Sequence, residues 1–213
     1  MRHDRLAFER WVIGVFGLIA MTSCLPYAMG STAATARPDQ LNMSTVFSVV
    51  RLSDSSVSLT SGRPSALMYD VEFRTGIDDR SDMGVRITTA SGLVGSYKRR
   101  LSGDETRGGF AFQVEGGVVN MADHIMGGIS LVGSGSEYST IGGFGGLRVL
   151  AVAPIAAGAA RDQASIGAFA GARLDFLRFM AFPEISVYYD RSALNLRRSN
   201  VLIVPSFTIR RSR

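Results

Sequence analysis

Few side chains in this sequence have the types and spacing that catalysis requires. The chain contains two histidines, His3 and His124, and one cysteine, Cys24. A nucleophilic serine needs a base within hydrogen-bond reach, and beyond the first forty residues only His124 can act as a histidine base. It lies in NMADHIMGG, residues 120–128, where we expect an ordinary surface turn. The sequence therefore predicts that the protein is not an enzyme.

Metal and phosphate sites are equally poorly supported. Asp78, Asp79 and Asp82 crowd one predicted turn, but they lack the spacing of a calcium-binding EF-hand loop, and Arg80 sits among them. A single cysteine allows neither an intramolecular disulfide nor a cysteine zinc site. The glycine-rich stretch GGFGG, residues 142–146, has no P-loop lysine after it. We predict no metal site and no cofactor.

The remaining candidates are charged residues that alternate with apolar ones. In LMYDVEFRTG, residues 67–76, the apolar side chains take every second position and the charged side chains take those between. A period of two predicts a β-strand with one apolar face and one charged face. Other segments repeat this pattern, and the residues on their charged faces are Asp70, Glu72, Arg74, Arg86, Lys98, Arg100, Glu115, Arg148, Arg173 and Glu184. We expect them to form one network.

The elements that position these charges are short strands. Period-two segments, broken by turn residues, are predicted at 44–52, 67–76, 83–90, 93–101, 109–120, 126–134, 139–154, 164–176, 182–190 and 200–210. The chain has 24 glycines, which long helices avoid. The sequence predicts an all-β fold, an antiparallel up-and-down meander over residues 42–210. Closure into a barrel of 8–10 strands removes exposed strand edges.

The first forty residues have a different composition. WVIGVFGLIA, residues 11–20, is an apolar run too short to span a bilayer and suited to a secretory signal. We predict a signal peptide at residues 1–23 and a flexible tether at 24–41, which is rich in serine, threonine and alanine. Ordinary signal-peptidase cleavage at 28–30 or 34–36 is the alternative, and it would remove Cys24.

The stretch MTSC, residues 21–24, resembles the lipobox of bacterial lipoproteins. That resemblance implies cleavage before Cys24 and a lipid on Cys24. Together with FRTGIDDRSDMGVRI (73–87) and FPEISVYY (182–189), the layout resembles small, poorly characterised outer-membrane β-barrel proteins and lipoproteins of Gram-negative bacteria. The resemblance implies an outer-membrane location. It also implies contact with outer-membrane lipid and with the barrel-assembly and lipoprotein-sorting machinery, and it brings no known activity.

The direction of the two strand faces decides between two kinds of barrel. A water-soluble barrel buries its apolar face, whereas a membrane barrel turns that face to lipid and its charges inward. The charges here are almost all arginines and acids, with Lys98 the only lysine, and arginine is suited to buried ion pairs. We therefore expect the charges to line the interior. The net charge of +5 comes without a basic run interleaved with aromatic residues, so no nucleic-acid partner is predicted.

Three functions remain open on the sequence. The first is a monomeric membrane barrel with a structural or interaction role, whose lumen is plugged by paired charges. The second is a narrow pore for small solutes or ions. The third is a lipid-anchored soluble barrel of the lipocalin type that binds an apolar ligand.

Overall fold

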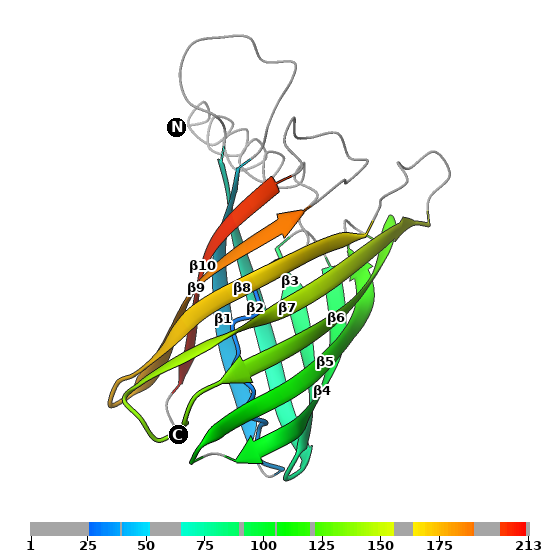
Figure 1. Cartoon of the computed structure of the whole chain (residues 1–213). Coiled ribbons are helices and arrows are strands. Elements are labelled where there is room, and N and C mark those ends of the chain that lie inside the picture. The colour runs from blue at the N-terminus through cyan, green and yellow to red at the C-terminus, as the bar shows by residue number, and fades with distance from the viewer. Residues whose placement is uncertain are drawn as a thin grey trace, which may run out of the picture.

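The computed structural model describes residues 26–38, 40–51, 65–89, 92–104, 106–119, 122–155, 164–189 and 201–211. These residues form ten antiparallel strands that close into one barrel (Figure 1). The strands are β1 (Leu41–Arg51), β2 (Ser65–Asp78), β3 (Ser81–Thr88), β4 (Gly92–Asp104), β5 (Gly108–Val119), β6 (His124–Ser134), β7 (Ile141–Pro154), β8 (Ser165–Asp175), β9 (Phe179–Tyr189) and β10 (Val201–Arg211). The prediction of an all-β closed meander is confirmed.

Every strand pairs with its neighbours in sequence, and the last pairs with the first. In that closing pair Phe47 of β1 lies opposite Phe207 of β10. The weakly patterned first segment is thus a full member of the wall. The register of strand pairing shifts at two places in the wall, one at Gly76–Asp78 of β2 and one at Arg100–Ser102 of β4. Among the described residues, no helix is long and apolar enough to cross a membrane.

The two faces of the wall differ as sharply as the sequence pattern predicts. Large apolar side chains point outward from strands all around the barrel, and Leu67, Ile129 and Ile185 keep 70%, 62% and 58% of their surface exposed. Asp70 and Glu72, which alternate with such residues, are buried on the inner face. The apolar face of each strand is therefore the outer one.

The two ends of the barrel differ in their connections. At one end, here called the turn end, the strands are joined by residues 79–80, 105–107, 135–140 and 176–178, and β1 begins and β10 ends there (Figure 1). At the other, the loop end, the connections include residues 52–64, 155–164 and 190–200.

The interior of the barrel, its lumen, contains residues 26–38 of the same chain. This inner segment, dark blue in Figure 1, makes hydrogen bonds with side chains from opposite parts of the wall, including Arg86 on β3, Arg148 on β7 and Glu184 on β9. Only a segment enclosed by the strands can do so. The sequence predicts a flexible tether at 24–41. Its described residues run inside the barrel instead, because small side chains fit the narrow lumen and main-chain hydrogen bonds fix them there.

Apolar side chains fill the rest of the lumen in two clusters. The first gathers near the loop end, where Tyr27 of the inner segment packs with wall residues that include Val50, Leu150, Tyr188 and Leu202. The second holds Met29 and Ala33 against Val132, Phe144, Phe169 and Phe182. The buried charged side chains of the wall share this interior with the two clusters.

Candidate functional site: the charged lumen

Glu184 on β9 accepts three hydrogen bonds, two of them from the main chain of the inner segment. Its two carboxylate oxygens accept hydrogen bonds from the main-chain N–H groups of Met29, at 3.0 Å, and Gly30, at 2.9 Å. The hydroxyl of Ser186, two residues along the same face, donates to the carboxylate at 2.8 Å. Three donors on one buried carboxylate stabilise its charge.

Two arginines hold the carbonyl groups of the same stretch. Arg86 on β3 donates to the carbonyl oxygens of Ala28, at 2.7 Å, and Met29, at 3.2 Å. Arg148 on β7 donates to the carbonyl of Tyr27 at 2.9 Å, and the hydroxyl of Tyr188 donates to that carbonyl at 2.5 Å. Anions of the wall thus meet N–H groups, and its cations meet carbonyl groups.

The same rule continues toward the turn end. Lys98 on β4 donates to the carbonyls of Thr32, at 3.2 Å, and Ala34, at 2.5 Å. Asp82 on β3 accepts from the N–H of Ala36 at 2.8 Å. These contacts reach main-chain atoms rather than side chains. The wall therefore fixes the path of the inner segment through its main chain, and most of the side chains between Ala28 and Ala36 are small.

The wall charges also pair with one another. Arg74 pairs with Glu72 at 2.8 Å and with Asp82, and Arg86 reaches the other oxygen of Glu72 at 3.3 Å. Lys98 lies 3.6 Å from Asp82, which links β2, β3 and β4. Since these groups are almost fully buried, removing one partner would leave an uncompensated charge in a medium of low dielectric.

A second group of ion pairs lies on the side of the barrel formed by β5 to β8. The Arg148 side chain is fully buried, and its Nε lies 2.9 Å from Oε1 of Glu115 on β5. Arg173 on β8 pairs at 3.0 Å with Glu137, which lies in the turn between β6 and β7. Charge pairs therefore link most of the strands around the interior.

The structure gathers most of the charged residues singled out by the sequence. Those buried on the inner face are Asp70, Glu72, Arg74, Arg86, Lys98, Glu115, Arg148, Arg173 and Glu184. Arg100 lies apart from them. It is half-buried beside the irregularity of β4, and its guanidinium donates to the carbonyl of Asp79 in a turn. Cys24 and the predicted signal peptide at 1–23 lie outside the described residues.

Two side chains expected in surface turns are part of the interior. Asp82 is buried and bonded to Arg74, because the turn occupies only residues 79–80 and the alternation of β3 already holds at Asp82. His124 is buried at the start of β6, on the same face as Met126. Extending the period of two by a few positions would have found both. The inner segment, by contrast, carries no periodic signal.

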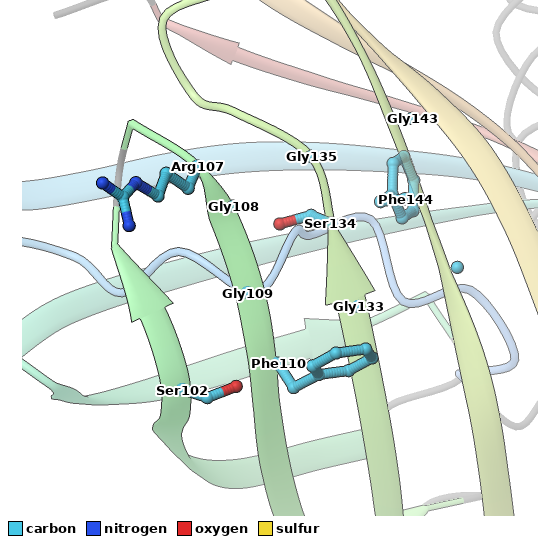
Figure 2. A pocket seen from close by; sticks show the side chains of 11 residues that line it. Ser102, Arg107, Gly108, Gly109, Phe110, Gly133, Ser134, Gly135, Gly143 and Phe144 are labelled. Carbon is cyan, nitrogen blue, oxygen red and sulfur yellow. The ribbon is translucent and has the colours of Figure 1, made fainter.

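The described part of the chain contains no group of three or more histidine, cysteine, aspartate or glutamate side chains placed to hold a metal ion. A glycine-lined hollow of about 560 Å³ lies near the turn end of β4–β7. Figure 2 shows the Phe110 ring lying beside Gly133, while Arg107 points away from that ring. A Cβ on Gly133 would meet the ring at 2.9 Å, so the glycine makes room for Phe110.

No protein-family model matches the chain, and no curated protein matches it. Three solved structures show a weak likeness to the chain. Neisserial surface protein A is 12% identical, with a TM-score of 0.39 over 80% of this chain and 96% of that one. The outer membrane protein OprG from Pseudomonas aeruginosa is 11% identical, with a TM-score of 0.32 over 85% and 96%. Ail of Yersinia pestis, in complex with the heparin analogue sucrose octasulfate, is 8% identical, with a TM-score of 0.30 over 80% and 95%.

The exterior of the barrel decides where this protein lies. Apolar side chains surround the closed wall and the charged ones point into the lumen, which is the arrangement that lipid requires and water disfavours. This is an outer-membrane β-barrel. Its strands of 8–14 residues match the 9–11 residues that a tilted strand needs to cross a bilayer.

Proposed function

We propose that the protein is a closed outer-membrane barrel with a structural or interaction role, whose lumen is plugged by the inner segment and the charge network. The observation that carries this proposal is the bonding of Glu184 and Arg86 to the main chain of residues 28–30. A plugged barrel acts through what it presents at its two ends and through its attachment to the membrane, and it has no need of an active site.

A narrow pore is the competing function, and conductance separates the two. We expect the purified wild-type barrel in a planar bilayer to give no reproducible conductance. A variant lacking residues 26–38 should conduct, because removal of the segment vacates the path that it occupies between the inward-facing side chains of the wall, many of which are charged. Heat-modifiable mobility on an unboiled gel shows that each variant is folded. Reproducible channels from the wild-type barrel would overturn the proposal in favour of a pore.

The third function, a tethered soluble barrel with an apolar ligand site, requires the opposite orientation of the strands. Its apolar side chains would fill the interior, yet residues such as Ile129 and Leu147 point outward. We therefore expect the protein to stay in the membrane fraction after a carbonate wash. Release by carbonate would restore the soluble barrel as the better reading.

Lipidation of Cys24 is a separate part of the proposal. It is supported by the lipobox-like MTSC motif at residues 21–24, and it would add about 0.8 kcal/mol of membrane affinity per buried CH₂. Radiolabelled palmitate should enter the wild-type protein and not Cys24→Ser. Equal labelling of both would exclude this site. The proposed partners are outer-membrane lipid and the barrel-assembly machinery, with the lipoprotein-sorting machinery involved if Cys24 is lipidated.

A further inference from the structure

A cavity of about 200 Å³ lies inside the barrel at the turn end, between the inner segment and the wall. Its wall residues stand near strand ends and include Asn42 of β1, Arg173 of β8, Phe182 of β9 and Arg210 of β10. Residues 34–37 of the inner segment form another side. At about 30 Å³ for each water molecule, the space would hold roughly six, or one small solute.

The lining of this cavity carries more positive than negative charge. Five cationic residues line it, namely Arg37, Arg74, Lys98, Arg173 and Arg210, against the three acidic residues Asp82, Glu137 and Asp175. Two of the carboxylates are already engaged, because Asp82 pairs with Arg74 and Lys98, and Glu137 pairs with Arg173. The surplus favours an anion in the cavity.

Arg210 is the cation that this network leaves unsatisfied. Its Nε and Nη2 atoms are shut off from solvent and donate to no acceptor among the described residues. The guanidinium carbon lies 5.0 Å from the centroid of the Phe182 ring, so the ring holds the guanidinium group over its face. Buried donors without acceptors are costly, and the planar fork of arginine matches the two oxygens of a carboxylate or phosphate.

We propose that this cavity is a binding site for a small oxyanion, the carboxylate or phosphate group of a solute, and that Arg210 is the main residue that binds it. Asn42 supplies an amide on the β1 side, and Met180 and Phe182 offer an apolar wall to the remainder of an organic anion. The site lies at the turn end, and the short turns of outer-membrane barrels face the periplasm, so the anion comes from the periplasmic side. Anion binding at this site goes beyond the structural role proposed above. It depends on that proposal only through residues 34–37 of the inner segment, which form one side of the cavity.

Titration of the full-length barrel in a non-ionic detergent tests the site, with inorganic phosphate and benzoate as probes and calorimetry as the readout. We expect saturable binding that Arg210→Gln weakens about tenfold to a hundredfold. Arg211→Gln is the matched control, because Arg211 is the exposed neighbour on the same strand, and it should bind as the wild type does. Equal affinities in the two variants, or no saturation at millimolar concentrations of either probe, would overturn the proposal.

A second measurement needs no variant and so is independent of folding defects. Phenylglyoxal modifies arginines, and mass spectrometry reads each site. Phosphate or benzoate should slow modification of Arg210 and leave Arg211 unchanged, whereas equal rates with and without the probes would contradict the site. Short-chain phosphatidylglycerol identifies the source of the oxyanion: protection by it, as well as by phosphate, assigns a lipid headgroup, and protection by phosphate alone assigns a free solute.

Discussion

The carboxylate of Glu184 accepts a hydrogen bond from the main-chain N–H of Met29 at 3.0 Å, across 155 positions of sequence. The side chain belongs to the wall and the N–H belongs to the inner segment. Such a bond would not be expected if the barrel enclosed the segment without fixing its position. The contact instead shows that the interior binds the main chain of the inner segment at a defined position. Its contribution to the free energy of unfolding can be measured.

Replacing Glu184 by leucine removes the acceptor of the Met29 and Gly30 N–H groups. With about 1–3 kcal/mol for each buried donor left unsatisfied, we expect the free energy of unfolding to fall by about 2–6 kcal/mol in urea titrations of the reconstituted barrel. Ile185→Val, on the outward face of the same strand, should change it little. In a chain lacking residues 26–38 the penalty of Glu184→Leu should disappear. A penalty of equal size in both backgrounds would show that Glu184 serves the wall alone.

The pair of Arg148 and Glu115 gives a second test. Glu115→Leu leaves the fully buried Arg148 side chain without its carboxylate, and we expect a loss of about 3–5 kcal/mol in unfolding free energy. The double variant with Arg148→Met should recover a large part of that loss. Val114→Leu, on the opposite face of β5, serves as the control. An effect near zero for Glu115→Leu would indicate a solvated pair.

The main chain of the inner segment can be tested at Gly30. Its φ of 60° lies in the left-handed region, and a Cβ there would stand 2.3 Å from Oγ1 of Thr208. Gly30→Ala should therefore destabilise the barrel by about 1–3 kcal/mol. It should also expose the segment to limited proteolysis. Gly127→Ala is the matched control, since its nearest neighbour is 3.9 Å away. Equal behaviour of the two variants would contradict the observed path of the segment.

The outer face is tested by Leu147, which precedes the buried Arg148 and is 60% exposed near the middle of β7. Leu147→Arg should cost about 2–4 kcal/mol in a bilayer, because a cation then faces hydrocarbon. Leu147→Phe keeps the side chain apolar and should have little effect. If arginine were tolerated as well as phenylalanine, the outer wall would be facing water.

How far the sequence predicts this molecule depends on which signal a residue carries. The strands and their two faces follow from the period of two, since each side chain's neighbours in the strand fix its direction. The polar residues around Asp82 predict a turn, although the alternation through Gly84 and Arg86 includes it. Arg210 stands beside a second arginine in the sequence, which gives no sign that it lies on the inner face with Thr208. The inner segment escapes prediction because main-chain atoms hold it, and every residue type presents the same main chain.

The position of the inner segment also constrains the order in which the barrel assembles. The segment precedes β1 in the chain, whereas the wall is completed by pairing β1 with β10, the two strands most distant in sequence. Contacts of such separation form late, because the entropy of closing the intervening chain opposes them. Threading a segment into a finished wall would mean passing it through an interior already filled by apolar side chains. We therefore expect the β1–β10 seam to close around residues 26–38, so that this last pairing traps the segment.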